Sequence, residues 1–326
     1  MIRRVIRNTL VVDAGDVRLA VYVSGPRDAP PIILVHGYPD SATVWEPVRA
    51  QLDTRYRVIA YDVRGAGASG APEGPGARRA YRLERLAADL AAVADATCGT
   101  RPFHLVGHDW GSIQSWEAVT DPAFAGRIAS YTSISGPCLD HASNGLRGSG
   151  GSVGPAKTGS ATKQPGALRQ VLKSWYIFFF HLPLVPELVW RAGGARMWPL
   201  WLRVTEGIRP PRDPAQLRNA LNGLNLYRAN FIERLLHPRA RHAHAPVQFL
   251  VPMRDRYVGP PLSLGLERWL GTYTREELDA SHWVVLRDPL RIATDIGRFV
   301  EQHAVRRDGE GNVNEGGALN SRTAGV

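Results

Sequence analysis

Residues 107–111 read Gly-His-Asp-Trp-Gly, and they lie between a largely apolar run, Phe103–Val106, and a helical pattern over Ser112–Val119. Small residues two positions before and two positions after a central polar residue permit the sharp strand-to-helix turn called a nucleophile elbow. Such a turn crowds its neighbours and strains the backbone at its apex, which favours glycine on both sides. We therefore expect Asp109 at the apex of a turn between a buried strand and a helix.

The apex residue of this turn is a carboxylate and not a hydroxyl. An aspartate attacks carbon by displacement and forms an alkyl ester on the protein, whereas a serine alkoxide is suited to acyl transfer. Asp109 therefore points away from esterases and toward enzymes that open epoxides or displace halide.

Strand and helix patterns alternate on both sides of the pentapeptide. Residues 10–12 and 17–23 read as an opening hairpin, and the all-apolar run 32–35 is typical of a strand buried on both faces. The alternation predicts an α/β fold, with a mostly parallel twisted sheet flanked by helices. Further strands are predicted at 56–61, 103–106, 128–134 and 247–251, and helices at 44–52, 83–96, 112–119, 262–270 and 292–300.

The alternation stops at about residue 137. Residues 141–166 are rich in Gly, Ser and Lys without a hydrophobic period, which predicts a mobile loop, and 167–236 look helical. We therefore expect a core interrupted by an inserted helical cap, followed by a polar, disordered tail. The predicted boundaries are 1–136 and 246–304 for the core, 137–245 for the cap and 305–326 for the tail.

Composition is ordinary for a soluble globular enzyme of 326 residues, with 44% hydrophobic and 21% charged residues. The formal net charge is +10, and its basic residues are scattered Arg with Lys only at 157, 163 and 173. A solvated basic surface accounts for this charge, and loose attraction to an anionic membrane or nucleic acid is the alternative. Because no nucleic-acid-binding motif is present, we expect no nucleic-acid partner.

Cellular location is inferred from the cysteines and the apolar segments. Cys98 and Cys138 provide no disulfide framework, and Met1–Arg7 lacks the apolar core of a signal peptide, so we expect a cytoplasmic protein. The most apolar stretch, Trp175–Trp190, is too short and too interrupted to span a bilayer. We expect no stable membrane insertion, while contact of an amphipathic cap with lipid, and a homodimer, are left open.

A nucleophile elbow implies an acid and a histidine later in the chain, in that order. Asp255 follows the predicted strand 247–251, and His282 follows after room for one more strand. Asp255 would orient the imidazole and stabilise its cation, while His282 removes a proton from water. The order of the three residues predicts a catalytic set of Asp109, Asp255 and His282.

His36-Gly37-Tyr38-Pro39 follows the strand that should supply the rest of an oxyanion hole. The backbone N–H groups of Tyr38 and Trp110 would stabilise the tetrahedral centre that forms when water attacks the ester. We interpret His36 and His108 as structural residues.

These motifs resemble the epoxide hydrolase family of the α/β-hydrolase fold, over about residues 10–303. The resemblance is carried by residues 36–39, by Asp62-Val63-Arg64-Gly65-Ala66-Gly67-Ala68-Ser69 and by residues 107–111. The family uses an Asp nucleophile, an Asp–His pair that activates water, and two cap tyrosines that hold the epoxide oxygen. Ser281 stands where the family usually has Gly, a small change.

Two segments resemble the tyrosine sites of that family and place them at Tyr176, in residues 174–183, and Tyr227, in residues 224–231. Opening an epoxide creates an alkoxide, and a phenol with a pKa near ~10 can protonate it without prior ionisation. Tyrosines among Phe and Trp residues can also serve in packing alone. Aromatic residues predicted to contact the substrate are Trp110, Trp175, Phe179 and Phe180.

The resulting hypothesis is a cofactor-independent epoxide hydrolase that converts a small apolar epoxide and water to a vicinal diol through an aspartyl ester. A haloalkane dehalogenase shares the Asp–His–Asp set, but such enzymes commonly carry Asn or another polar residue at the position of Tyr38. A non-catalytic ligand-binding protein of the same fold is the alternative from another class. We expect no metal, because His237, His242 and His244 lack a Cys or carboxylate to complete a site.

Overall fold

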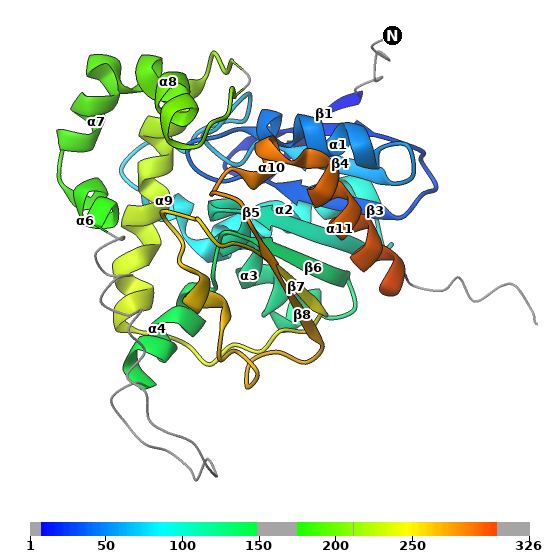
Figure 1. Ribbon diagram of the computed structural model, residues 1–326. Coiled ribbons are helices and arrows are strands. Elements are labelled where there is room, and N and C mark those ends of the chain that lie inside the picture. Colours follow the sequence, from blue (N-terminus) through cyan, green and yellow to red (C-terminus); the bar gives the residue numbers. More distant parts are fainter. Residues whose placement is uncertain (1–7, 149–174, 211, 305–326) are drawn as a thin grey trace, which may run out of the picture.

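The computed structural model describes residues 8–148, 175–210 and 212–304, and its centre is an eight-stranded sheet (Figure 1). The strand order is β1-β2-β4-β3-β5-β6-β7-β8. β2 pairs antiparallel with β1 and β4, and all other pairs are parallel, so the predicted hairpin and mostly parallel sheet are confirmed. The strands are β1 (Asn8–Asp13), β2 (Arg18–Ser24), β3 (Pro31–Val35), β4 (Arg57–Tyr61), β5 (Phe103–His108), β6 (Ile128–Ile134), β7 (Val247–Pro252) and β8 (Tyr273–Leu278).

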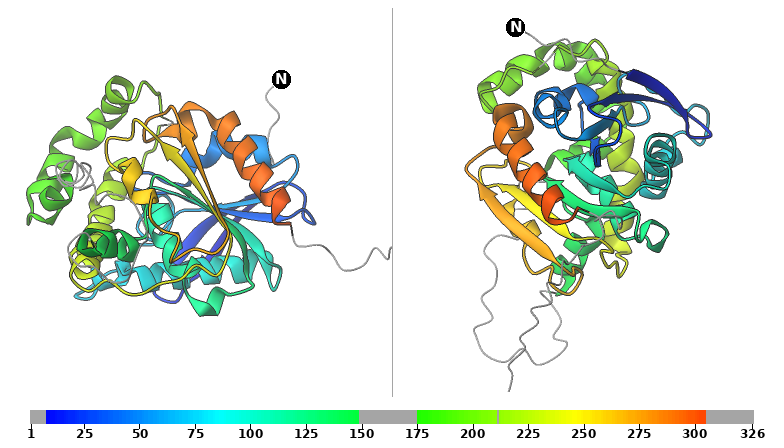
Figure 2. Two further views of the ribbon diagram at one scale, coloured as in Figure 1. Left: turned by 60° about the horizontal axis from the view of Figure 1, so that its bottom comes forward. Right: turned by 90° about the vertical axis from the view of Figure 1, so that its right-hand side faces the viewer.

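Helices cover both faces of the sheet (Figure 2). Alternate residues of β3 enter different cores, because side chains of a strand point to opposite faces. Ile32 and Leu34 belong to one buried cluster and Ile33 and Val35 to the other, so this strand is buried on both faces as predicted. The first cluster packs under α1 (Glu46–Leu52), α10 (Val284–Arg287) and α11 (Pro289–Gln302), and the second under α2 (Leu83–Cys98) and α3 (Trp110–Val119).

A helical insert connects β6 to β7 (Figure 1, green to yellow). Its long helix α9 packs against α4, α6 and α8, and the insert lies beside the carboxyl ends of the parallel strands. Among the residues that the structure describes, no helix combines the length and hydropathy that a membrane span requires. The described elements of the insert are α4 (Leu139–Gly148), α6 (Trp175–His181), α7 (Val185–Val189), the π-helical turn η4 (Trp190–Gly194), α8 (Ala195–Thr205) and α9 (Gln216–Leu236).

The prediction of a mobile loop over 141–166 is wrong for its first part, because residues 141–148 belong to α4. The inward side of this helix is polar. Asp140 pairs with Arg239 at 2.8 Å, and the His141 ring donates to the Arg241 carbonyl at 2.7 Å. Since polar contacts and not apolar burial hold the helix, the sequence shows no hydrophobic period there. The rest of the predicted loop, 149–166, and the predicted tail, 305–326, lie outside the described residues.

The helix predicted over 262–270 is also wrong. A short 3₁₀ turn, η5 (Pro260–Ser263), is followed by an irregular segment in which Gly265 has a φ of +68°. Leu266 and Leu270 are buried, and their spacing of four residues imitates one face of a helix. The left-handed backbone at Gly265 interrupts any helix across this segment.

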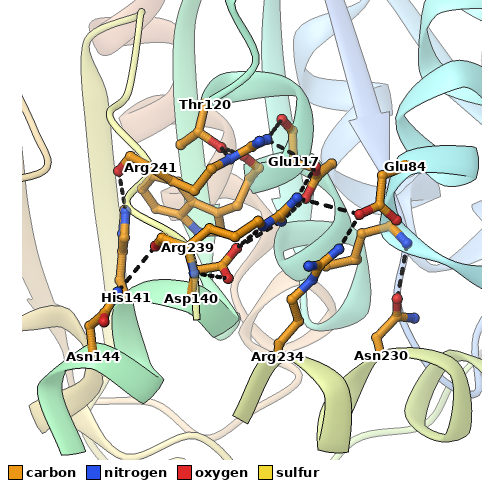
Figure 3. A network of polar contacts seen from close by, with 12 residues as sticks. Glu84, Glu117, Thr120, Asp140, His141, Asn144, Asn230, Arg234, Arg239 and Arg241 are labelled. Carbon is orange, nitrogen blue, oxygen red and sulfur yellow. Dashed lines mark hydrogen bonds and ion pairs between the residues drawn. The ribbon is translucent and has the colours of Figure 1, made fainter. Parts of the chain in front are cut away.

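Charged side chains hold the base of the insert to the core (Figure 3). Arg239, which follows α9, donates to Glu117 at 2.6 Å and to Asp140 at 2.8 Å. Arg241 donates to the Glu117 carboxylate and to the Thr120 hydroxyl, both at 2.9 Å. Glu117 and Asp140 are buried carboxylates, so these arginines supply the charge that such groups need. We call this set the basal ionic cluster.

Candidate active site

Asp109 occupies the turn between β5 and α3, with φ of 53° and ψ of −123°. Residues other than glycine rarely adopt this conformation, and it costs about 1–3 kcal/mol. The end of β3 comes very close to this turn: a Cβ on Gly111 would lie only 2.0 Å from the Val35 carbonyl oxygen. The predicted strand–turn–helix unit is confirmed, and the turn lifts the Asp109 side chain clear of the sheet.

The Asp109 carboxylate is held by the loop after β3. The Tyr38 N–H donates to Asp109 Oδ1 at 2.7 Å. A Cβ on Gly37 would lie only 2.3 Å from the same oxygen, so the backbone can reach the carboxylate only if residue 37 is glycine. The Trp110 N–H, the first of α3, has no partner within its helix by position. The two amides of the predicted oxyanion hole therefore flank Asp109.

His282 links the two predicted carboxylates. Its Nε2 lies 3.5 Å from Asp109 Oδ2, and its Nδ1 lies 2.8 Å from Asp255 Oδ2. An ionised carboxylate only accepts, so Nδ1–H donates to Asp255 and Nε2 faces Asp109. The other oxygen of Asp255 accepts from the N–H groups of Tyr257 and Val258, at 2.8 and 2.9 Å. Asp109 thus forms one connected set with Asp255 and His282, which both lie more than a hundred positions later in the chain.

Burial and charge act in opposite directions on this set. Burial disfavours a charged imidazole, but the carboxylates of Asp255 and Asp109 outweigh it and raise the pKa of His282 well above 6.5. Burial also raises the pKa of Asp255, yet the charge and hydrogen bond of His282 and the two backbone N–H groups lower that pKa overall. In the resting protein, a cationic His282 thus lies between two carboxylates.

A cavity of about 340 Å³ opens above Asp109 and His282. Most of its surface is aromatic, and the insert contributes the greater part of the wall. This is the shape and polarity expected of a site for an apolar small molecule. The lining residues are Tyr38, Pro39, Asp109, Trp175, Tyr176, Phe179, Phe180, Val189, Trp190, Gly194, Met197, Trp198, Trp201, Tyr227, Tyr257, His282 and Trp283.

Tyr176 of α6 and Tyr227 of α9 both line this cavity, with ring centroids 6.1 Å apart. Burial, reinforced by the Asp109 charge, raises the pKa of each phenol well above 10, so both hydroxyls stay protonated at neutral pH. Arg228, next to Tyr227, donates to the Phe180 carbonyl at 2.7 Å and pairs with Glu187 at 2.5 Å. This contact joins α9 to α6 and α7 and keeps the two tyrosines on one wall.

The other residues predicted to contact a substrate are placed differently from one another. Trp175, Phe179 and Phe180 line the cavity. The Trp110 side chain does not, because its ring is buried behind Tyr227, at a centroid distance of 4.8 Å. Contact of the Trp110 ring with a substrate therefore stays a prediction, and in this structure the ring packs against Tyr227.

Several residues that line the cavity were not predicted from the sequence. The rings of Tyr257 and Trp283 lie 5.0 and 4.6 Å from the His282 ring and confine it from two sides. Trp283 also donates to Asp40 at 2.9 Å, and burial raises the pKa of Asp40 to about 7. Tyr257 lies two residues after Asp255, and Trp283 directly follows His282. Their position next to predicted catalytic residues was the one signal in the sequence that could have identified them.

His36 and His108, which were predicted to be structural, each form a hydrogen bond with the backbone. The Val63 N–H donates to His36 Nε2 at 2.9 Å, and the buried His108 ring donates to the His282 carbonyl at 2.9 Å. The part of the chain described here contains no group of three or more His, Cys, Asp or Glu suited to a metal.

Residues 65–70 have the Gly-x-Gly-x-x-Gly spacing of a dinucleotide-binding turn. In this structure they form a turn closed by a Gly65–Gly70 hydrogen bond, and no helix begins there, unlike in a dinucleotide site.

Comparison with known proteins agrees with this geometry. The family model described as "alpha/beta hydrolase fold" matches residues 30–289. The chain is 32% identical over 300 residues to "Probable oxidoreductase EphD" of Mycobacterium tuberculosis, a match covering 89% of this chain and 49% of that protein. The chain thus spans about half the length of that relative.

For two further proteins, the match includes a larger share of the other protein. "Epoxide hydrolase A" of Mycobacterium tuberculosis is 32% identical over 265 residues, covering 81% of this chain and 72% of that protein. The crystal structure of Bacillus megaterium epoxide hydrolase in complex with an inhibitor superposes with a TM-score of 0.72 at 22% identity, covering 90% of this chain and 100% of that one. At that identity the superposition supports the fold. The chain therefore belongs to the epoxide hydrolase family of the α/β-hydrolase fold.

Proposed function

We propose that the protein is an epoxide hydrolase that forms a covalent ester on Asp109. The main support for this proposal is that the protonated phenols of Tyr176 and Tyr227 share one apolar cavity with Asp109 and His282. A carboxylate nucleophile alone also suits halide displacement, but a departing halide needs no proton, whereas an opening epoxide does. In this proposal the insert, residues 137–245, acts as the cap over the core.

In the first step, Asp109 Oδ2 attacks an epoxide carbon and the bond from that carbon to the ring oxygen breaks. Tyr176 and Tyr227 bind that oxygen, and one of them transfers its proton to it. Asp109 Oδ1 stays on the Tyr38 N–H as the carbonyl oxygen of the new ester. The products of this step are a hydroxyalkyl ester and a tyrosinate.

In the second step, His282 takes a proton from water, and the resulting hydroxide adds to the ester carbonyl carbon. The Tyr38 and Trp110 N–H groups stabilise the negative oxygen of the tetrahedral centre. When the centre collapses, the alkoxide of the diol leaves with the proton from His282. Asp109, regenerated as a carboxylic acid, gives its proton to His282 and so restores the resting state, and the sum is epoxide plus water to diol.

Electrostatics would order the two steps. In the resting state the Asp109 charge contributes to the high pKa of His282. Ester formation removes that charge, so the pKa of His282 falls, its proton passes to the tyrosinate, and the imidazole becomes the free base that the second step needs. Asp255 would then stabilise the imidazolium that forms as water is deprotonated.

The test offers the protein an aryl epoxide, a fatty epoxide and a haloalkane, and measures diol and free halide. We expect diol from the epoxides; halide release without diol would favour the dehalogenase, and neither product would favour a binding protein. Single turnover in heavy-oxygen water checks the ester: the first diol should carry an unlabelled oxygen from Asp109. Full labelling of the first diol would contradict the covalent step.

A further inference from the structure

The outward side of the insert carries large apolar side chains in contact with solvent. On α8, Met197, Leu200, Trp201 and Val204 are all exposed, and their spacing of three, four and seven residues places them on one face. Soluble monomers seldom expose a continuous apolar stripe of this kind without a partner.

The two shorter helices of the insert continue this pattern. On α6, Trp175 and Phe178 are exposed three residues apart, and Leu184 and Leu188 are exposed four residues apart at α7. We call these side chains, together with the α8 stripe, the outer apolar surface. All three helices pack on one another or on η4 and α9, and Figure 1 shows them together at one side of the molecule, next to α9.

The active-site cavity opens into this surface. Trp175, Val189, Met197 and Trp201 line the cavity, yet each is more than half exposed, at 66%, 51%, 54% and 53%. A side chain that is both a cavity wall and solvent-exposed marks the mouth of that cavity. A molecule in contact with the outer apolar surface therefore has direct access to the site.

The charges around the surface have one sign. Arg191, Arg196 and Arg203 are exposed, and the last two lie four residues before and three residues after Leu200, beside the apolar stripe. Neither forms an ion pair with another described residue. The carboxylates between 175 and 210 are Glu187, paired with Arg228, and Glu206, which is buried. No exposed carboxylate in that described stretch offsets the arginines.

We propose that the outer apolar surface docks onto an anionic phospholipid bilayer, with the cavity mouth facing the lipid. Helices with aromatic and aliphatic side chains on one side and flanking basic residues lie in the plane of a bilayer interface, where apolar burial and attraction to anionic headgroups act together. A second copy of the chain fits less well, because a symmetric contact would place the same arginines against one another. Apolar epoxides would then enter from the lipid.

The test is flotation of the full chain with vesicles of phosphatidylcholine alone, or mixed with phosphatidylglycerol. We expect flotation with the anionic vesicles only, weakening as salt is raised. The double variant Arg196→Glu/Arg203→Glu should bind at least about 25-fold more weakly, at roughly fivefold per lost arginine. Arg27→Glu, in the loop before the amino end of β3, is a single charge-reversal control away from the insert and should bind as the unaltered protein does.

The apolar part is tested with Phe178→Ser/Leu188→Ser against Leu290→Ser, an equally exposed leucine on α11. Only the first variant should lose flotation, and thermal melting confirms that each variant is folded. Equal loss in both, or equal binding to the two kinds of vesicle, would overturn the proposal. A dimer in sedimentation that the Phe178/Leu188 variant abolishes, without vesicle binding, would assign the surface to a second copy. Since none of these residues lines the cavity, diol formation from a water-soluble epoxide reports separately on the proposed function.

Discussion

The two walls of the cavity are held in place by different means. On the core wall, Asp109, Asp255 and His282 are fixed by backbone N–H groups and by one another, at 2.7 to 3.5 Å. On the insert wall, Tyr176 and Tyr227 are held by ring-to-ring packing and by the contacts of Arg228 with α6 and α7.

This difference separates the chemistry from its selectivity. A nucleophile must be placed to within a fraction of an ångström, which strained turns and short hydrogen bonds achieve. Aromatic packing on helices tolerates changes of shape more readily, so the insert wall can adapt to a substrate while the core wall stays constant. Substitutions on the core wall should therefore affect catalysis most.

The largest effect is expected for Asp109→Asn. An amide cannot displace the epoxide oxygen, so kcat should fall by more than about a thousandfold. The measurement is diol formation together with the intact mass of the protein, which should show no adduct. Undiminished turnover would remove Asp109 from the mechanism.

The second effect concerns His282→Gln, which keeps the size of the side chain but loses the base. Hydrolysis of the ester should slow by about 10²–10⁴-fold, while alkylation of Asp109 continues. Mass spectrometry should therefore detect a protein carrying one substrate. If no adduct accumulates, His282 acts before the ester forms and the ordering of the two steps is wrong.

The insert wall is probed with Tyr176→Phe and Tyr227→Phe. Each loses one hydrogen bond to the epoxide oxygen, so alkylation should slow by about 10–100-fold, and the double variant by more than about a thousandfold. Rapid-mixing kinetics of adduct formation measures this step alone. Single variants with unchanged alkylation would reduce the tyrosines to packing residues.

The pH dependence follows from the raised pKa of His282. Because the ester state lacks the Asp109 charge, the hydrolytic step should fall about tenfold per pH unit once pH drops below the lower pKa of His282 in that state. A raised pKa also stabilises the fold at pH below 6.5, and this contribution is lost as pH rises through the folded-state value. As the pH is raised, the melting temperature should therefore fall less in His282→Gln than in the unaltered protein.

The smallest catalytic effect is expected where the insert is anchored. Arg239→Met leaves the buried Asp140 without its cation and Glu117 with Arg241 alone, and it should cost about 2–4 kcal/mol of unfolding free energy, with little change in kcat. Arg228→Met should do the reverse, raising KM several-fold while costing about 1 kcal/mol or less, because its partner is more exposed. Urea unfolding and steady-state kinetics on both variants measure the two effects.

Sequence patterns predicted the core well because its determinants are local. The strain at Asp109 and the crowding at Gly111 require particular residues at fixed spacing, so the turn is visible in the sequence. Strands buried on both faces likewise appear as continuous apolar runs. The insert was harder, because α4 is held by polar contacts with Arg239 and Arg241, almost a hundred residues later.

The sequence by itself determined that an aspartate stands at the apex of the turn after β5, the order in which Asp109, Asp255 and His282 follow along the chain, and the alternation that builds the sheet, since each depends on residues near one another or on fixed topology. Only the tertiary structure decided that Tyr257 and Trp283 confine His282, that the Trp110 ring supports Tyr227, and that the cavity opens among exposed Trp and Met side chains. Those features arise where segments far apart in the chain meet, and no local pattern encodes the direction from which a ring approaches its neighbour.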